Sequence, residues 1–393
     1  MKRIGIYGGA FNPPHIGHMQ GAKYALEALE LSILLLIPSC VSPHKPLPQN
    51  SPDPAQRLEM LRLAATDDRF RVSDLELSRG GTSYTYETVE QVREMYPDAE
   101  LVLLMGTDMF LSFDQWRMPE RILKNASIAV MCRGEKGEKE QISEKTPRLA
   151  QMGAKIYVLE NPVLAISSTE LRRLLIFRCA DEFVPMSVAQ YIDDNNLYAC
   201  LTDRKALPME QLEREVTNLL KPSRVPHVLG CRDTAVALAR RWGADETDAA
   251  RAGILHDVTK ALTTQQQFAL CKAYGVEIDE FSRRNPKILH ALTGSLVAER
   301  IFGENDAVVN AIRTHTAGEA GMDLLQKIIY VADYMEPNRD FEGVEELRDL
   351  AYTDIDKALK MGLTWATDIL RRQGREISPD SQALMDELNR KGI

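Results

Sequence analysis

The stretch RIGIYGGAFNPPHIGHMQGAKYALEAL, residues 3–29, decides the fold of the first half of the chain. A short β-rich run, Arg3–Tyr7, leads into Gly8 and Gly9, and Met19–Leu29 has the apolar spacing of a helix. Glycines where a strand meets a helix let backbone amides approach a phosphate closely, and the helix amino terminus adds a favourable dipole. The stretch therefore predicts a strand, an anion-binding turn and a helix.

Two histidines stand in this turn, His15 and His18. Because they are three residues apart in the first turn of the helix, we expect them to share one face. Both can donate hydrogen bonds or positive charge to a pentacoordinate phosphorus or a departing pyrophosphate. The alternative is that they merely cap the helix. The spacing matches neither a Walker loop nor GxGxxG.

The rest of the first half alternates β-rich runs with helical segments, which predicts a mostly parallel sheet covered by helices, with ligands at the carboxyl ends of the strands. The charge-rich segment Arg133–Lys145 is expected to be a solvated loop. The predicted strands are Ile4–Tyr7, Ile33–Ile37, Val72–Leu77, Leu101–Met105, Ile128–Met131 and Ile156–Leu159.

From Leu207 onward helical periodicity replaces the strands, and a polar segment at 199–206 marks the boundary. A chain of 393 residues suits two domains, which we place at 1–200 and 207–393. The fold class is thus a Rossmann-like α/β domain followed by an all-α domain. The predicted helices of the second domain are 207–220, 227–242, 245–259, 263–275, 287–302, 304–314, 322–336 and 343–372.

The composition excludes several classes of protein. A formal charge of -9 argues against a broad electrostatic grip on nucleic acid, and no apolar run is long enough for a membrane helix. The six cysteines form no CxxC pair, and the amino terminus has no secretory signal, so a cytoplasmic location is expected. A homo-oligomer is left open.

A second anion-binding motif occurs at Ile166–Arg172, directly after the last predicted strand. Ser167 and Glu170 form an S-x-x-E capping box, which predicts a helix start with amide donors. Arg172, one turn into that helix, could fork onto a phosphate.

Together the HxGH and ISSTxxR segments resemble the nucleotidyltransferase superfamily that carries these two signatures. Within it, residues 1–198 resemble bacterial nicotinate-nucleotide adenylyltransferases. The resemblance implies attack by the mononucleotide phosphate on the α-phosphorus of ATP, with release of pyrophosphate, no covalent intermediate and Mg²⁺ as cofactor. It implies catalysis by His15 and His18. The ATP-binding residues that it implies are Gly8, Gly9, Phe11, His15, His18, Ser167, Ser168 and Arg172.

Further segments bear on the second substrate. Within the same resemblance, Pro43–Lys45 matches a phosphate-binding turn, Ser83–Tyr86 matches a segment that contacts the nicotinate carboxylate, and Trp116 matches an aromatic that stacks on the pyridine ring. Pantetheine-phosphate adenylyltransferases and cytidylyltransferases share the HxGH chemistry, but this set is not expected in them. The implied nicotinate mononucleotide-binding residues are Lys45, Thr85, Gly106, Asp108, Trp116 and Arg133.

Four of the seven histidines fall in the helical half, together with two notable aspartates. Imidazole and carboxylate are good ligands for Fe, Mn or Zn, and a bridging aspartate can hold two ions. His256 and Asp257 adjoin in an apolar small-residue segment, where an unpaired buried carboxylate would cost several kcal/mol, roughly. The alternative is a solvated helix-end aspartate. The expected metal ligands are His227, His256, Asp257, His290, His315 and Asp333.

The segments around these ligands resemble the HD superfamily of phosphohydrolases. More closely, His227–Gly230, His256–Lys260 and Ile329–Arg339 resemble the bacterial symmetrical diadenosine-tetraphosphate hydrolases. This implies two ions, iron or similar, that activate water to give two ADP, with Asp257 and Lys260 catalytic. Lys260 and Arg339 are candidate phosphate binders. The alternatives are a phosphohydrolase for guanosine polyphosphates or mononucleotides, and a binding module that does not cleave its ligand.

Overall fold

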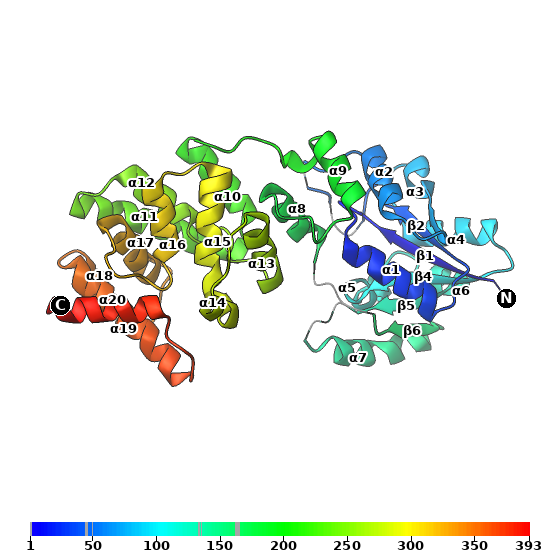
Figure 1. Cartoon of the computed structure of the whole chain (residues 1–393). Helices are drawn as coiled ribbons and strands as arrows, with labels where there is room; N and C mark the ends of the chain where they lie inside the picture. The colour runs from blue at the N-terminus through cyan, green and yellow to red at the C-terminus, as the bar shows by residue number, and fades with distance from the viewer. Residues whose placement is uncertain (1, 44–45, 49, 133, 135, 162–165) are drawn as a thin grey trace. The chain divides into compact units, whose positions relative to one another are not determined.

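The computed structural model describes residues 2–43, 46–48, 50–132, 134, 136–161 and 166–393. The chain divides into two compact units (Figure 1). The first comprises Met1–Ile176 and Ala180–Leu201, and the second comprises Phe177–Cys179 and Thr202–Ile393. Within the described ranges, no helix combines the length and the apolarity needed to cross a membrane.

A six-stranded parallel sheet forms the centre of the first unit, in the order β3-β2-β1-β4-β5-β6. The strand order reverses between β1 and β4, and the carboxyl ends beside such a reversal are where α/β sheets bind ligands. The predicted α/β fold is therefore confirmed, and the turn after β1 lies at the switch point. The strands are β1 (Arg3–Gly9), β2 (Ile33–Pro38), β3 (Phe70–Val72), β4 (Glu100–Gly106), β5 (Ala126–Met131) and β6 (Ile156–Leu159).

Both faces of this sheet are buried. Along β2, Leu34 and Leu36 join one core cluster while Leu35 and Ile37 join the other, as the two-residue period of a strand requires. Helices on both faces add residues to these clusters, and other helices complete the unit. They are α1 (Ile16–Ala28), α2 (Pro54–Ala64), α3 (Leu75–Arg79), α4 (Thr85–Met95), α5 (Thr107–Leu111), η1 (Phe113–Gln115), α6 (Pro119–Asn125), α7 (Glu138–Gln151), α8 (Ser168–Ile176), α9 (Met186–Asp194) and η2 (Leu197–Ala199).

Two local predictions for this unit are wrong. The strand predicted at Val72–Leu77 ends at Val72, and α3 begins at Leu75, because alternation over so few residues fits a helical turn equally well. The solvated loop predicted at Arg133–Lys145 is helical from Glu138, since Ile142 lies in the core and anchors the charged α7.

The second unit is built of helices, and its described residues contain no strand. Its centre is formed by α11, α12, α16 and α17, which pack against one another. The helices are α10 (Met209–Leu219), η3 (Pro222–Arg224), α11 (Val225–Trp242), α12 (Glu246–Leu255), α13 (Thr264–Ala273), α14 (Glu280–Arg284), η4 (Pro286–Ile288), α15 (Leu289–Val297), η5 (Ala298–Phe302), α16 (Asp306–Thr314), α17 (Leu324–Met335), α18 (Val344–Ala351), α19 (Ile355–Arg372) and α20 (Pro379–Arg390).

A glycine sets the close approach of two of these helices. A Cβ atom on Gly253 of α12 would lie 2.7 Å from the Cα of Arg232 on α11, so no other residue fits without moving backbone. This contact brings the beginning of α11 near the end of α12, where the histidines lie.

The all-α prediction for this unit is confirmed, with local errors. The helix predicted at 343–372 is two helices, because Asp354 caps a new start by accepting from the Lys357 amide at 3.1 Å. The helices α14 and α20 were not predicted.

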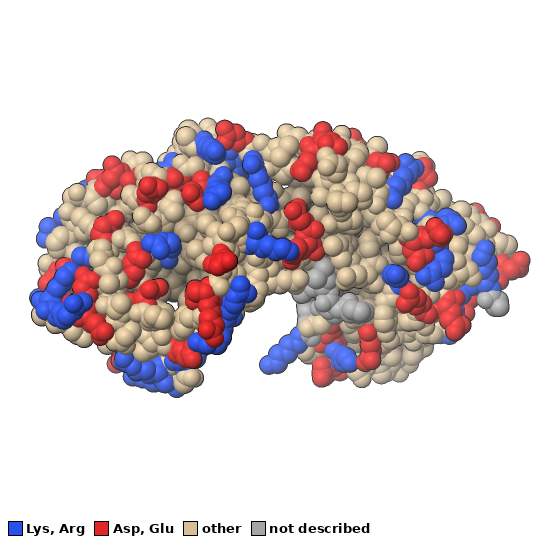
Figure 2. Space-filling view, in the orientation of Figure 1, with Lys and Arg blue, Asp and Glu red and all other residues tan. Residues whose placement is uncertain are grey.

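Charged side chains of both signs are interspersed on the face shown in Figure 2, with no continuous basic stripe on that face. The pattern on this face lacks the clustered lysines and arginines of a nucleic-acid footprint.

Candidate functional sites

The turn after β1 places two histidines against each other. His15 is the N-cap of α1, and its Nδ1 accepts from the His18 amide at 3.2 Å. In return, His18 Nδ1 accepts from the His15 amide at 3.2 Å, and the two rings stack with centroids 3.5 Å apart. A neutral ring whose Nδ1 accepts carries its hydrogen on Nε2. Capping thus uses one nitrogen of each ring and leaves Nε2 as a donor.

The two glycines before this turn leave space at the end of β1. A Cβ on Gly8 would meet nothing closer than the Ile37 oxygen at 4.0 Å, and one on Gly9 would meet the Phe11 ring at 3.5 Å. A Cβ atom would therefore fit at both positions. Neither glycine has a positive φ, so the backbone conformation does not require glycine there. The Phe11 ring is buried and packs edge-on against His18, with centroids 5.2 Å apart. Phe11 thereby supports the histidine from the protein side.

The ISSTxxR segment reaches the same turn. Its capping box is present, since the Ser167 and Glu170 amides donate to each other's side chains at 2.7 and 3.2 Å. Ser168 Oγ donates to the Pro13 oxygen at 3.1 Å. Arg172 Nη1 donates to the Asn12 oxygen at 2.7 Å, and burial lowers the pKa of this arginine. The structure therefore brings Ser168 and Arg172 onto the HxGH turn.

The residues predicted to bind nicotinate mononucleotide lie at helix starts and beside a core cluster. Thr85 begins α4, Gly106 ends β4 and is the N-cap of α5, and Asp108 lies in the first turn of α5. Trp116 is half-buried against Phe113, with ring centroids 5.3 Å apart. The other two predicted residues, Lys45 and Arg133, lie outside the described residues.

Four histidines of the second unit point their Nε2 atoms at one small space. The Nε2 atoms of His227 and His256 are 3.3 Å apart, and those of His290 and His315 are 3.2 Å apart. Asp257 lies between the pairs. Its Oδ2 is 3.7 Å from His227 Nε2 and 3.5 Å from His256 Nε2, whereas its Oδ1 is 3.5 Å from His290 Nε2 and 3.8 Å from His315 Nε2.

A further carboxylate completes the first of these groups. Asp333 Oδ1 lies 3.1 Å from His227 Nε2 and 3.9 Å from His256 Nε2. Two sets of atoms, each compact enough for one ion, result: His227, His256 and Asp333 in one, and His256, Asp257 and His315 in the other. These sets contain five of the six predicted metal-ligating residues, and the sixth, His290, belongs to neither set but has its Nε2 3.2 Å from that of His315.

Acceptors hold the other nitrogen of each of these rings. His227 Nδ1 lies 3.1 Å from Glu336 Oε1, and the Nδ1 atoms of the other three rings lie 2.6–2.8 Å from backbone oxygens. Neutral rings so held carry hydrogen on Nδ1 and direct Nε2 lone pairs into the cluster. Lone pairs facing each other at such distances repel unless a cation lies between them. Buried Asp257 Oδ1 also has no hydrogen-bond partner, so the donor set fits metal ions.

Three cationic side chains surround this cluster. Arg224 Nε donates to Asp257 Oδ2 at 2.6 Å, and Arg339 Nη2 donates to Asp333 Oδ1 at 2.6 Å. Lys260 Nζ lies 2.8 Å from His290 Nε2. These groups place positive charge beside both halves of the cluster, which suits an anionic ligand.

The chain matches two families along its length. Residues 6–174 match the Cytidylyltransferase-like family. A relative from Exiguobacterium sibiricum, named "Probable nicotinate-nucleotide adenylyltransferase", is 35% identical over 199 residues, covering 50% of this chain and 99% of the relative. A relative of the same name from Methylococcus capsulatus is 36% identical over 208 residues, covering 50% of this chain and 99% of its own. The amino-terminal half belongs to the nicotinate-nucleotide adenylyltransferase family.

Beyond this adenylyltransferase-family half, residues 224–338 are an HD domain. This range contains all six residues of the histidine and aspartate cluster. A solved structure from Clostridium acetobutylicum, described as a "predicted HD superfamily hydrolase involved in NAD metabolism", is 35% identical. It covers 47% of this chain and 98% of its own, with a TM-score of 0.46.

Two residues of the HD domain site escaped the sequence analysis. Glu336, which holds His227, is three residues after Asp333 and so shares its helix face, a spacing that could have indicated it. A Cβ on Gly230 would collide with the Glu336 carboxylate, so this glycine makes room for it. Arg224 stands outside any motif, and no sequence signal pointed to it.

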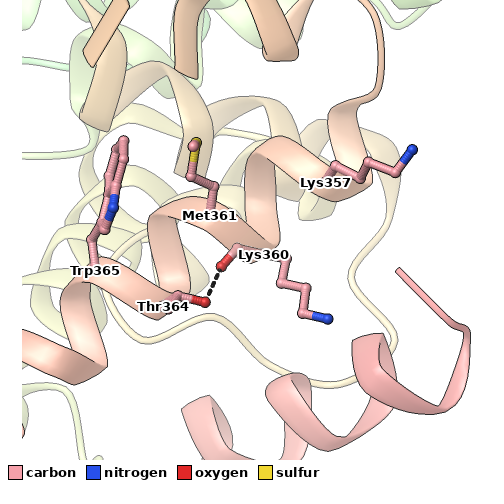
Figure 3. A pocket seen from close by; sticks show the side chains of 5 residues that line it. All are labelled: Lys357, Lys360, Met361, Thr364 and Trp365. Atoms are coloured by element: carbon pink, nitrogen blue, oxygen red, sulfur yellow. Dashed lines mark hydrogen bonds between the residues drawn. The ribbon is translucent and has the colours of Figure 1, made fainter. Parts of the chain in front are cut away.

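The HD domain half also has a surface hollow of about 360 Å³ that involves none of these ligands (Figure 3). Its lining residues all come from α19, where Thr364 Oγ1 donates to the Lys360 oxygen at 2.7 Å. The lining residues are Lys357, Lys360, Met361, Thr364 and Trp365.

Proposed function

We propose that the α/β unit transfers the adenylyl group of ATP to nicotinate mononucleotide, giving deamido-NAD and pyrophosphate. The observation that carries this proposal is the pair of cross-capped histidines at the switch point of the sheet, in a turn whose carbonyls accept from Ser168 and Arg172. Membership of half the chain in the nicotinate-nucleotide adenylyltransferase family supports the choice of substrates.

In this reaction a phosphate oxygen of the mononucleotide forms a bond to the α-phosphorus. The bond from that phosphorus to the oxygen bridging to the β-phosphate breaks, and pyrophosphate leaves with the electron pair. The Nε2–H groups of His15 and His18 donate to the oxygens on which negative charge grows. The amino terminus of α1 and Gly8 and Gly9 admit the phosphates. No residue forms a covalent intermediate.

Mg²⁺ would supply charge neutralisation on the phosphates. The candidate metal-ligand groups among the described residues all belong to the helical unit, so the described part of the α/β unit offers no protein cage. This fits Mg²⁺, which commonly takes most of its ligands from phosphates and water. We assign the mononucleotide to Thr85, Gly106, Asp108 and Trp116, with Lys45 and Arg133.

The test is pyrophosphate release by the full chain from ATP with nicotinate mononucleotide, compared with nicotinamide mononucleotide. We expect release with the nicotinate form and much less with the nicotinamide form. Release with neither would refute the assignment, and preference for the nicotinamide form would refute the proposed specificity.

The HD domain unit, in the same proposal, hydrolyses a nucleoside polyphosphate, with diadenosine tetraphosphate giving two ADP as the specific substrate. Two ions, iron or a similar metal, would be held by the six clustered ligands with Asp257 shared, and would activate the attacking water. Lys260, Arg339 and Arg224 bind phosphate oxygens. Because they flank both halves of the cluster, they suit a chain of phosphates better than a single one.

Two measurements on the full chain separate this function from its rivals. Elemental analysis should give about two transition-metal ions per chain, and diadenosine tetraphosphate should yield ADP as the sole nucleotide product. Cleavage of guanosine polyphosphates or mononucleotides instead would indicate another phosphohydrolase. Absence of metal and of cleavage would leave only a binding module.

A further inference from the structure

Arg57 on α2 is a buried arginine whose acidic neighbour, Asp53, interacts with it only through space. Its side chain is 0% exposed, and no carboxylate of a described residue forms an ion pair with it. Its Nε is buried without a hydrogen-bond partner. Removal from solvent lowers the pKa of this guanidinium. Burying such a group is costly, so a salt bridge does not explain its presence.

The guanidinium instead joins the ends of two neighbouring strands. Nη1 donates to the Ala10 oxygen at 2.9 Å and Nη2 to the Cys40 oxygen at 3.4 Å. These carbonyls follow β1 and β2, which are linked at the same level by the Ser39 amide donating to the Gly9 oxygen at 2.9 Å. Arg57 therefore lies beneath the turn that carries His15 and His18.

This contact sets the direction of a peptide group. In a trans peptide the carbonyl and the next amide point opposite ways, so the Phe11 N–H points away from Arg57. That amide makes no hydrogen bond to any residue the structure describes. An unpaired amide turned away from Arg57 beside the HxGH helix start is a donor for an anion.

The other carbonyls of the turn are held in the same manner. Arg172 Nη1 donates to the Asn12 oxygen at 2.7 Å, and Ser168 Oγ donates to the Pro13 oxygen at 3.1 Å. Three backbone oxygens that would repel a phosphate are thus engaged by protein donors. Arg57 forms no ion pair with a described carboxylate, and Asp53 offsets its charge only through space, so the guanidinium adds positive potential below the turn.

We infer that Arg57 is a positioning residue for the triphosphate of ATP: it fixes the Ala10 carbonyl inward, so that the Phe11 amide and the positive potential face the phosphates. The inference rests on the proposed adenylyl transfer. It assigns to Arg57 a larger effect on ATP than on the mononucleotide, because the shorter of its two contacts, at 2.9 Å, is to Ala10 in the phosphate turn, whereas the contact to Cys40 is 3.4 Å.

Arg93 provides a matched control. It also holds backbone oxygens, donating to four of them, and the two shortest contacts are to Ala99 at 2.7 Å and to Asn125 at 2.6 Å. These two residues precede β4 and β5, at the opposite end of the strands. If Arg57 only connects backbone segments, its replacement should affect nucleotide binding no more than replacement of Arg93 does. The experiment compares R57M, R57Q and R57K with R93M, all in the full chain.

Binding of α,β-methylene-ATP is measured by calorimetry, and KM and kcat are measured with both substrates. We expect R57M and R57Q to weaken analogue binding at least about tenfold and to raise KM for ATP, with KM for nicotinate mononucleotide within about threefold of wild type. R57K, which keeps the charge and can reach one carbonyl, should fall between. R93M should bind the analogue as wild type does.

A folded Arg57 variant that binds the analogue within about twofold of wild type would overturn the inference, as would equal losses for R57M and R93M. Circular dichroism identifies folded variants, and R57K keeps the comparison available if R57M does not fold. Wild type that binds the analogue but releases no pyrophosphate would reject adenylyl transfer, while the binding comparison would still decide the role of Arg57.

Discussion

The two histidine clusters of this chain use the imidazole ring in opposite ways. At the HxGH turn, the Nδ1 atoms of His15 and His18 accept from backbone amides, so the Nε2 atoms are donors suited to phosphate oxygens. In the HD domain, the Nδ1 atoms lie against carbonyls or Glu336, so the Nε2 atoms offer lone pairs suited to cations. The partner of the inner nitrogen therefore decides whether a histidine serves an anion or a metal.

The largest expected effect comes from Asp257→Asn, which changes the carboxylate whose two oxygens face the two histidine pairs of the HD domain. We expect loss of bound metal and a fall in hydrolysis of about three orders of magnitude or more, with adenylyl transfer unchanged. Metal content and ADP release give the answer. Asp233→Asn, on the exposed side of α11, is the control and should keep both. Wild-type metal content in Asp257→Asn would contradict the shared-ligand arrangement.

At the HxGH turn, His18→Ala should lower the turnover of adenylyl transfer by about two to four orders of magnitude, with folding and hydrolysis intact. His18→Gln should recover part of the loss, because the glutamine amide can place a donor near the position of Nε2. Pyrophosphate release in single-turnover and steady-state assays measures both variants. Equal activity of the two would mean that donation from this position is unimportant.

The histidine cluster of the HD domain can be tested through Glu336, the residue that contacts the Nδ1 atom of His227. Glu336→Ala removes the oxygen 3.1 Å from His227 Nδ1 and should weaken metal affinity by about 10–100-fold, while leaving the ligands present. Competition with a chelator gives the affinity. Glu345→Ala, on the exposed side of α18, should leave the chelation curve unchanged. A wild-type curve for Glu336→Ala would show that its contact with His227 does not orient the ring.

The smallest effect concerns the helix that brings Arg172 to the turn. Ser167→Ala removes the capping hydroxyl of α8 and should cost about 1 kcal/mol locally. Amide hydrogen exchange should quicken in α8 and not in α20. Ser378→Ala, which removes the cap of α20, should do the reverse. Unchanged exchange in α8 after Ser167→Ala would show that this cap contributes little.

Local patterns predicted most of the architecture because the spacing of apolar residues differs between strands and helices and can be read from the sequence alone. Val72–Leu77 was misassigned because a few alternating residues also fit a helical turn. Arg133–Lys145 was misassigned because its charges concealed the buried position of Ile142. Both errors concern segments whose structure depends on tertiary contacts.

For the sites, the sequence indicated the residues and the kind of ligand that each group suits, but not which ring nitrogen carries the hydrogen. The convergence of six ligands on several helices followed from resemblance and not from spacing, since a helical bundle can bring distant residues together in many ways. The donor or acceptor state of each histidine depends on contacts of Nδ1 that only the folded backbone provides. Arg57 and Arg224 act through geometry that no motif records.

One hydrogen bond joins the HxGH turn to a residue near the end of the α/β unit. Tyr198 donates its hydroxyl hydrogen to Asn12 Oδ1 at 2.9 Å, across 186 residues of sequence, and burial raises the pKa of this phenol so that it stays protonated. A residue near the end of the α/β unit thus stabilises the turn near its start. During synthesis, a chain that has not yet released Tyr198 from the ribosome lacks this hydrogen bond, so nucleotide capture should begin only once the whole unit has emerged.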